Sequence, residues 1–245
     1  MKIVALTGAG VSADSGLGTF RDRNGTGIWS RFDPRKLATP EAFASDPDEV
    51  NAFYNARRRN LIPATPNPAH FALARLETAL AERGGDLTLI TQNIDDLHER
   101  AGSTRVIHMH GELLKARCTD CEGVNPWRKD LGLQDQCPVC GRMGGLRPHV
   151  VWFGEMPLQM KAIYAALKGA DLFVAIGTSG AVYPAARFAA QARTFGIGTL
   201  EINLEPSDNA NQFGERRYGR ASEMVPVWVS EVLASLDVAI IIPTG

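Results

Sequence analysis

Apolar and polar positions follow two alternating patterns along most of this chain. Short apolar runs, typical of strands buried on both faces, alternate with stretches in which apolar residues recur every three or four positions, as on one face of a helix. The apolar runs predict strands at residues 2–7, 87–91, 105–109, 171–176 and 198–203. Because strands that alternate with helices pair in parallel, the order predicts an α/β fold: a Rossmann-like parallel sheet with helices on both faces.

The periodic stretches predict the helices between these strands. They lie at residues 40–61, 95–101, 157–169, 184–195 and 227–236, and one more begins at Pro68 and ends before Gly84. Asp46-Pro47 should divide the stretch at 40–61 into two short helices, because proline starts helices more readily than it continues them. In the helix that begins at Pro68, the expected apolar stripe is Phe71, Leu73, Leu76 and Leu80, and His70 is expected to be structural.

A cysteine-bounded segment interrupts the α/β rhythm between residues 113 and 146. It holds the four cysteines of the chain as two Cys-x-x-Cys pairs, Cys118 with Cys121 and Cys137 with Cys140. This spacing is typical of a zinc ribbon, and in a cytosolic chain it favours metal over disulfides. Four thiolates fill a tetrahedral site, so we expect one structural zinc ion here and catalysis elsewhere.

Composition narrows the class of protein. With 245 residues, 44% of them hydrophobic, the chain can form one large domain with a small insertion and a sizeable core. The formal net charge of −1 gives no basic field, so we expect neither direct nucleic-acid binding nor membrane binding. The first apolar run is too short for a signal peptide and no later run approaches membrane-spanning length, which leads us to expect a cytoplasmic protein.

Small-residue turns follow two of the predicted strands. After the first strand, Gly8-Ala9-Gly10 leads into a short helix, and glycines with a helix N-terminus suit a bound pyrophosphate. The third glycine of this stretch is Gly16, which departs from the G-x-G-x-x-G spacing of dinucleotide sites. The alternative is a tight strand-to-helix turn without a ligand. Gly177-Thr178-Ser179 forms the second such turn after residues 171–176.

Polar residues gather after the strand at residues 87–91. Gln92, Asn93 and Asp95 follow this strand, and His108 and His110 come shortly afterwards. Ligands of open α/β sheets bind beyond the carboxyl ends of strands, so polar side chains there indicate site chemistry. The alternative is a helix N-cap at Asn93 or Asp95 with a pair of surface histidines.

Two other segments carry candidate binding residues. Asn203 and Glu205 leave the last strand where a ribose hydroxyl or an adenine could be bound, and capping or turn formation is the alternative. Residues 147–155 alternate in character and predict an extended segment whose free edge could accept a peptide as an added strand. An ordinary buried strand is the alternative there.

One pair on a predicted helix suits an anionic group. Tyr54 and Arg57 are three residues apart and so share a face, where a phenol and a guanidinium could hold one carboxylate. The alternative is that Arg57-Arg58-Arg59 is a charge run on a solvated helix face, as such runs usually are.

Taken together, these motifs resemble the sirtuin family, the NAD-dependent protein-lysine deacylases, from residue 3 to about residue 236. The matching motifs are Gly8-Ala9-Gly10-Val11-Ser12, Gly16 through Thr19-Phe20-Arg21, Thr91-Gln92-Asn93-Ile94-Asp95, His108-Met109-His110-Gly111, the four cysteines, Phe153-Gly154-Glu155, Gly177-Thr178-Ser179 and Ile202-Asn203. The resemblance implies NAD and one structural zinc ion as cofactors, and acylated-lysine proteins or peptides as partners.

The resemblance also implies roles for individual residues. NAD would contact Gly8, Ala9, Gly10, Phe20, Arg21, Gln92, Asn93, Asp95, Gly177, Thr178, Ser179, Asn203 and Ala221. The catalytic residues would be Gln92, Asn93 and His110, with His110 as the general base on the ribose hydroxyls and His108 as a supporting residue. The acyl-lysine would contact Ala38, Tyr54, Arg57, Val151, Phe153, Gly154 and Glu155.

The acyl preference follows from the same resemblance. Sirtuins that remove acidic acyl groups, prokaryotic members among them, are similar to this chain in carrying Tyr-x-x-Arg on this helix and a small residue at the position of Ala38. This implies removal of succinyl and malonyl as well as acetyl groups. The alternatives are a plain lysine deacetylase, a protein ADP-ribosyltransferase on the same NAD site, or a zinc-ribbon binding module with a vestigial nucleotide site.

We also predict three parts of the chain. Residues 1–34, 62–112 and 148–245 would form the NAD-binding Rossmann-like domain, residues 35–61 a helical insertion that forms the acyl pocket, and residues 113–147 the zinc-ribbon module.

Overall fold

A parallel sheet forms the centre of the molecule. The computed structural model describes residues 1–19 and 27–241, with side chains up to residue 237. Within these ranges the larger sheet has six strands, β1 (Lys2–Thr7), β2 (Asp86–Thr91), β3 (Val106–His108), β7 (Leu172–Ile176), β8 (Gly198–Asn203) and β9 (Glu215–Tyr218). Their order is β3-β2-β1-β7-β8-β9, and each neighbouring pair is parallel. The predicted Rossmann-like sheet is confirmed.

The strand order places a crevice between β1 and β7. From β1 the chain moves outward to β2 and β3, and from β7 it moves outward in the other direction to β8 and β9. The loops at the carboxyl ends of β1 and β7 therefore lead away from each other, and open α/β sheets bind their ligands at such a point.

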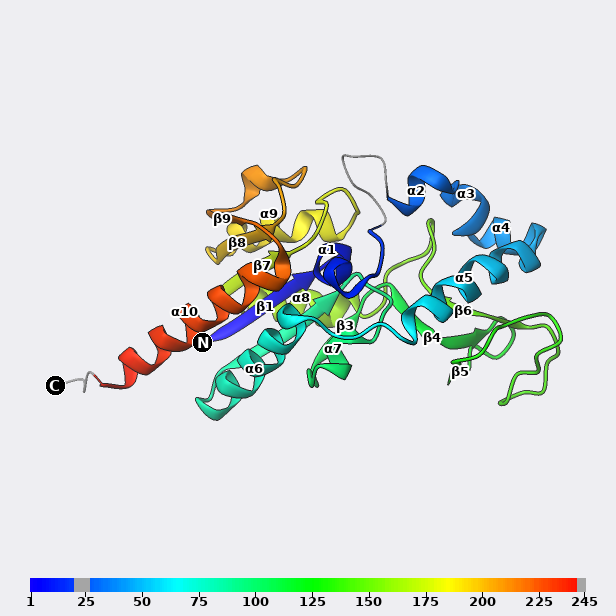
Figure 1. Cartoon of the computed structure of the whole chain (residues 1–245), viewed down its shortest axis with the longest axis horizontal. Coiled ribbons are helices and arrows are strands. Elements are labelled where there is room, and N and C mark those ends of the chain that lie inside the picture. The colour runs from blue at the N-terminus through cyan, green and yellow to red at the C-terminus, as the bar shows by residue number, and fades with distance from the viewer. Residues whose placement is uncertain (20–26, 242–245) are drawn as a thin grey trace.

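Helices cover both faces of the sheet. Alternate residues of β1 point to opposite faces, so Ile3 packs with α6 (Pro68–Glu82) and α10 (Ala221–Ile241). Val4 packs on the other face with α8 (Met160–Lys168) and α9 (Phe188–Thr194). Helices α6 and α10 run side by side along the sheet (Figure 1). Shorter helical pieces are α1 (Ala9–Ser12) and α7 (Leu97–Arg100), and 3-10 turns at Ala13–Ser15, Ala185–Arg187 and Ala210–Gln212.

A first insertion of four helices follows α1 on the chain. These helices are α2 (Ile28–Arg31), α3 (Pro34–Leu37), α4 (Pro40–Ser45) and α5 (Pro47–Leu61). The last three each begin with a proline directly after a side chain that caps the helix: Asp33, Thr39 and Asp46 each accept a hydrogen bond from a backbone N–H of the first turn. The predicted break at Asp46-Pro47 is confirmed.

A second insertion separates β3 from α8. It contains a three-stranded antiparallel sheet in the order β5-β4-β6, with β4 (Gly111–Cys118), β5 (Val124–Pro126) and β6 (Leu146–Val150). Both insertions leave the parallel sheet beyond carboxyl ends of its strands, and they gather at the end of the molecule opposite the last turns of α10 (Figure 1).

The two insertions share one hydrophobic core. Val50 and Leu61 of α5 pack in one cluster with Leu113 of β4, Val150 of β6 and the adjacent Trp152. A cluster built from both insertions fixes α5 against the antiparallel sheet, because burial of each large apolar side chain contributes on the order of 1.5–3 kcal/mol. The exact boundaries of the three predicted parts stay a prediction.

Polar contacts at the buried Arg58 strengthen this junction. Arg58 is 0% exposed, and its Nε donates to the carbonyl oxygen of Leu113 at 3.2 Å, while Nη1 donates to Asn55 Oδ1 at 2.6 Å. Asn55 in turn donates from Nδ2 to the carbonyl oxygen of Leu131 and accepts from the Leu131 N–H, both at 2.9 Å. Burial lowers the pKa of Arg58 to about 10, so the guanidinium is still charged at neutral pH.

Several details of the structure differ from the sequence expectations. Strand β9 was not predicted, because Glu-Arg-Arg-Tyr is a polar sequence at the sheet edge. Helix α10 begins at Ala221 and extends to Ile241, well beyond the predicted range 227–236. Phe71 is 52% exposed and is wrong as a member of the apolar stripe, since it lies about 200° around the helix from Leu73.

Among the helices within the described ranges, none is long and apolar enough to cross a membrane.

Replacement of Asn55 by alanine should destabilise the junction between the insertions. The substitution removes the acceptor for Arg58 and leaves both backbone groups of Leu131 without this partner, so we expect the free energy of unfolding to fall by about 2–4 kcal/mol. Urea titration followed by circular dichroism measures this change. Asn60→Ala, on the exposed face of the same helix, is the matched control and should change stability by less than about 0.5 kcal/mol. Equal effects of the two substitutions would contradict the assigned role of Asn55.

Candidate active site

One large cavity lies between the parallel sheet and the two insertions. Its volume is about 590 Å³, within the range of about 300–1,000 Å³ that is usual for small-molecule sites. Of the residues predicted from sequence, those in its wall are Gly8, Ala9, Gly10, Ala38, Tyr54, Gln92, Asn93, His110, Val151, Phe153, Gly154, Glu155, Gly177, Thr178, Ser179, Asn203 and Ala221. Asp95 and Arg57 are not part of this wall, and Phe20 and Arg21 lie outside the described residues.

Three glycines bring the turns after β1 and β7 into backbone contact. A Cβ atom on Gly8 would lie 2.7 Å from the carbonyl oxygen of Gly177, and one on Gly10 would lie 2.7 Å from the Cα of Gly177. Gly177 itself has a φ of +61°, which side-chain-bearing residues rarely adopt. The N–H groups of Gly8 and Gly10 donate to the carbonyl oxygens of Ile176 and Gly177. These two amides therefore hold the turns together and do not themselves face a phosphate.

Asn93 presents an acceptor to the cavity. It is 4% exposed, and its Nδ2 donates to the carbonyl oxygen of Gly8 at 3.1 Å and to Ser12 Oγ at 3.2 Å. Because both amide hydrogens are directed at these partners, the group that Asn93 can offer to a ligand is its amide oxygen.

Asp95 lies beneath this part of the wall. Its carboxylate accepts hydrogen bonds from Ser12 Oγ at 3.1 Å and from the N–H of Leu97 at 3.2 Å. Burial raises the pKa of Asp95, and the two hydrogen bonds oppose that shift. In this position Asp95 supports Asn93 through the shared Ser12 hydroxyl.

Two buried histidines extend the polar layer below the cavity. His70 accepts a hydrogen bond from the N–H of Asn67 and completes the capping box of α6, so its predicted structural role is confirmed. His98 Nε2 lies 3.0 Å from Thr7 Oγ1, and the His70 and His98 ring centroids are 4.8 Å apart. Burial lowers the pKa of His70 to about 4 and that of His98 well below its usual value. Both rings are therefore neutral at physiological pH.

His110 and His108 differ in protonation and exposure. The Nδ1 atom of His110 lies 3.0 Å from the carbonyl oxygen of Gln92, and a carbonyl can only accept, so Nδ1 carries the hydrogen and Nε2 has a free lone pair. Burial lowers the pKa of His110, which keeps this lone pair available. Burial also lowers the pKa of His108, but the hydrogen bond and charge of Glu99 outweigh it and raise the pKa overall. His110 is therefore the better base of the two.

The loop after β8 closes one end of the cavity. Asn203 Nδ2 donates to the carbonyl oxygen of Thr178 at 2.7 Å, which ties the ends of β8 and β7 together. Buried Glu201 accepts from the N–H of Ser207 at 3.2 Å and from the Tyr218 hydroxyl at 3.2 Å, and so fixes the loop. The predicted binding residue Glu205 lines the cavity.

Sequence reasoning missed several residues of the wall at this end. They are Asp14, Pro206, Ser207, Asp208 and Arg220. The signal for the loop residues was their position directly after Asn203 and Glu205. Arg220 and Asp14 form an ion pair at 2.7 Å although they are far apart in sequence, so no local pattern could have joined them.

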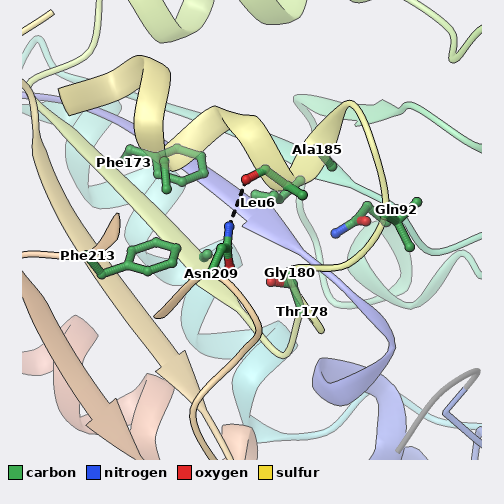
Figure 2. A pocket seen from close by; sticks show the side chains of 12 residues that line it. Leu6, Gln92, Phe173, Thr178, Gly180, Ala185, Asn209 and Phe213 are labelled. Carbon is green, nitrogen blue, oxygen red and sulfur yellow. Dashed lines mark hydrogen bonds between the residues drawn. The ribbon is translucent and has the colours of Figure 1, made fainter. Parts of the chain in front are cut away.

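A small pocket borders the main cavity at Gln92 and Thr178, which line both spaces. Its volume of about 10 Å³ is close to the minimum for one water molecule. Figure 2 shows the amide of Asn209 in its wall, donating at 2.8 Å to the carbonyl oxygen of Ala186, with the rings of Phe173 and Phe213 nearby. Gln92 therefore borders both spaces.

The other end of the cavity is largely aromatic. Tyr54 is 3% exposed and lines this end together with Ala38, Trp29 and Trp152. Burial raises the pKa of Tyr54 to about 12, so the phenol is neutral at physiological pH. Arg57, one turn further along α5, is half-buried with its guanidinium 5.3 Å from the centroid of the Phe53 ring.

The arginine run on α5 does not form one solvated face. Arg57 is half-buried, Arg58 is fully buried and only Arg59 is exposed, where it pairs with Asp130. Successive helix residues point about 100° apart, so three adjacent arginines reach three different environments. The interpretation as an ordinary charge run is therefore wrong.

The segment after β6 lines the cavity floor near Ala38. β6 is an outer strand of its sheet, but the N–H groups of Val151, Trp152 and Phe153 donate to His110, Glu155 and Ala38, respectively. The expectation of a free strand edge is therefore wrong for these three residues, because their backbone N–H groups already donate to acceptors within the protein. Their backbone instead ties the second insertion to both the histidine and the first insertion.

The four cysteine sulfurs form a compact cluster. All four lie within 4.8 Å of one another, with Sγ–Sγ distances of 3.7 Å for Cys118 and Cys140 and 3.8 Å for Cys121 and Cys137. A tetrahedron with zinc–sulfur bonds of about 2.3 Å has edges of about 3.8 Å. The cluster is therefore positioned to bind one zinc ion, and these thiolates lie outside the cavity wall.

Comparison with known proteins agrees with this arrangement. A family model described as the Sir2 family matches residues 8–184. An NAD-dependent protein deacylase of Caulobacter vibrioides is 60% identical over 236 residues, which cover 96% of this chain and 98% of that protein. One from Leishmania major is 55% identical over 234 residues, covering 94% and 95%. One from Escherichia coli strain K12 is 54% identical over 237 residues, covering 96% and 83%.

Solved structures match over a similar extent. A complex of a Sir2 homolog with NAD superposes with a TM-score of 0.85 at 40% identity and covers 96% of this chain and 90% of that one. A structure of Sir2 bound to an acetylated peptide has a TM-score of 0.77 at 28% identity and covers 94% and 92%. By the family model and by relatives that match along almost its whole length, this chain belongs to the Sir2 family, the sirtuins.

Proposed function

We propose that this protein is an NAD-dependent protein-lysine deacylase that removes succinyl and malonyl groups in preference to acetyl groups. The observation that carries the proposal is the single cavity, which joins the glycine turns at the sheet crevice to the Tyr54 end and has His110 between them. A nucleotide at the crevice and an acyl-lysine at the other end would meet beside an imidazole.

The relatives support the general activity. Those from Caulobacter vibrioides and Escherichia coli are named NAD-dependent protein deacylases, and both match this chain over most of its length. Sir2 structures with NAD and with an acetylated peptide support the same two classes of ligand for the cavity.

The residues at the crevice fit NAD. When bound, NAD supplies a nicotinamide leaving group and a ribose carbon that can accept the acyl oxygen. The turns at Gly8, Gly10 and Gly177 have no side chains and contribute backbone to this end of the wall, and Asn203, Ser207 and Ala221 also line it. Asn93, held by Gly8 and Ser12, presents its amide oxygen to an amide or hydroxyl donor of the ligand.

His110 is placed to remove a proton. The hydrogen bond to the carbonyl oxygen of Gln92 fixes the tautomer in which Nε2 is the acceptor. With NAD bound, Nε2 would act as the general base that accepts a proton from a ribose hydroxyl.

The end of the cavity at Tyr54 fits a short acidic acyl group. Ala38 leaves room where a larger side chain would fill the end of the cavity. Tyr54 provides a neutral phenol as a hydrogen-bond donor, and Arg57 provides the positive charge one helical turn away. We propose that the guanidinium of Arg57 leaves the Phe53 ring to meet the acyl carboxylate.

A direct assay separates this proposal from its rivals. The protein is incubated with NAD and matched peptides that carry succinyl-lysine, acetyl-lysine or unmodified lysine, and nicotinamide and peptide masses are followed. We expect faster turnover of the succinyl peptide, with loss of the acyl group. Faster turnover of the acetyl peptide would indicate a plain deacetylase, and a mass gain on unmodified peptide would indicate an ADP-ribosyltransferase.

The pH profile should reflect the environment of His110. Burial disfavours the imidazolium, so the pKa lies below the usual value of 6.5 and the base form persists as the pH falls through 6.5. We expect kcat/KM for the succinyl peptide to decline only at lower pH. His110→Ala should lower kcat at least about 100-fold. The variant should also lack this decline of kcat/KM at low pH while still binding NAD. If kcat/KM of the native protein declined with a midpoint above pH 6.5, the result would contradict the assignment of His110 as the general base.

Arg57→Met should lower desuccinylation much more than deacetylation. Loss of a charge-assisted contact worth about 1.5–3 kcal/mol corresponds to about a 10- to 150-fold lower kcat/KM on the succinyl peptide. Arg59→Met is the matched control, since Arg59 is exposed on the same helix and pairs with Asp130. An equal loss of both activities in Arg57→Met would refute the carboxylate contact.

A further inference from the structure

Trp152 contacts the acyl end of the cavity from beneath Tyr54. It follows β6 in the chain, is 3% exposed, and its Nε1 lies 3.0 Å from the Tyr54 hydroxyl oxygen. The two rings come from the two different insertions and are separated by 98 positions in sequence.

The chemistry of the indole decides the direction of this hydrogen bond. Indole Nε1–H is a donor only, so Tyr54 must be the acceptor. A phenol that accepts through a lone pair still has its own hydrogen to donate. In the part of the chain that the structure describes, no hydrogen bond has the Tyr54 hydroxyl as donor, and Tyr54 lines the cavity.

We propose that Trp152 is a positioning residue that orients the Tyr54 hydroxyl as a hydrogen-bond donor toward the carboxylate of an acidic acyl group. This inference rests on the proposed deacylase function and adds a determinant of acyl selection to it. Burial also keeps the Tyr54 phenol protonated, because it raises the pKa to about 12, so the donor is present across the physiological range.

The indole is itself held in place by an ion pair. The Arg147 guanidinium carbon lies 3.3 Å from the centroid of the Trp152 ring, and Arg147 pairs with both oxygens of Glu155 at 2.7 and 3.0 Å. Glu155 also accepts from the backbone N–H of Trp152 at 2.8 Å, which closes the arrangement around this residue. A stacked, paired guanidinium of this kind restricts rotation of the indole.

The same ion pair adjusts the charge at this end of the cavity. Glu155 lines the cavity, where an unpaired carboxylate would repel an acidic acyl group. Arg147 neutralises it, and Arg117 lies 3.3 Å from the same carboxylate. The pKa of Glu155 is lowered overall: burial raises it, but the hydrogen bond and charge of Arg147 outweigh that effect. Glu155 therefore fixes Trp152 without presenting an uncompensated negative charge.

A double-mutant cycle tests the inference. Trp152→Phe, Tyr54→Phe and the double variant are assayed on succinyl-lysine and acetyl-lysine peptides with NAD. We expect Trp152→Phe to lower the succinyl-to-acetyl ratio of kcat/KM about three- to tenfold, mainly through a higher KM for the succinyl peptide. In the Tyr54→Phe background it should change this ratio no further, because the hydroxyl that it orients is gone.

Two outcomes would overturn the inference. One is an equal loss on both peptides in Trp152→Phe, and the other is the same change in the ratio with and without the Tyr54 hydroxyl. If the wild-type protein turns over neither peptide, the proposed function fails. If it is a desuccinylase whose preference Trp152→Phe does not alter, only the inference about Trp152 fails.

Matched variants separate orientation from folding. Trp228→Phe, a buried tryptophan of α10 outside the cavity, controls for the loss of an indole and should leave the ratio unchanged. If Trp152→Phe does not fold, benzothienylalanine at position 152 replaces only the N–H with sulfur and keeps the ring stacked on Arg147. The same drop in the ratio is expected with this isostere, and an unchanged ratio would contradict the inference.

Discussion

The backbone contact between the turns after β1 and β7 is the constraint on which the rest of the site depends. Gly8, Gly10 and Gly177 pack without any side chain between them, and two of their amides join the turns by hydrogen bonds. A side chain here would separate the two halves of the sheet where the strand order diverges. Because the turns are this close, the three glycines contribute only backbone to the crevice above them. Asn93 is held beside it by the Gly8 carbonyl oxygen.

The two insertions build the other half of the site as a unit. Neither the helices of the first nor the small sheet of the second could bury its apolar face alone, and their shared core places Tyr54 against Trp152. Phe153 and Val151 then tie this core to Ala38 and His110 through the backbone. Different parts of the chain therefore position the nucleotide end of the cavity, the base His110 and the acyl end, and these parts meet in one cavity.

Much of this could be predicted from sequence because the signals are local. Buried parallel strands are apolar runs, capping residues and prolines mark helix starts, and paired Cys-x-x-Cys motifs indicate a metal. Where these signals were absent, prediction failed. β9 is a polar edge strand, and Phe71 lies on the exposed side of a helix whose three leucines are buried.

Sequence motifs singled out the candidate site residues, but only the structure shows how these residues are arranged. Most of them line one cavity, whereas Asp95 lies below it and Arg57 outside the described wall. The different environments of Arg57, Arg58 and Arg59 depend on packing against the second insertion, which no helix pattern contains. The contact between Trp152 and Tyr54, and that between Arg220 and Asp14, joins residues remote in sequence.

Strand β4 links two features that are otherwise separate. Its first residue follows His110 directly, and its last residue is Cys118, one of the four clustered cysteines. A strand of this length spans on the order of 25 Å, so the metal cluster is too distant to take part in the reaction. Because a metal would bind only the folded arrangement of the four cysteines, metal binding would stabilise the folded state that also contains the site at His110. The concentration of available metal would thus affect how stable the folded enzyme is, although the reaction itself does not use the metal.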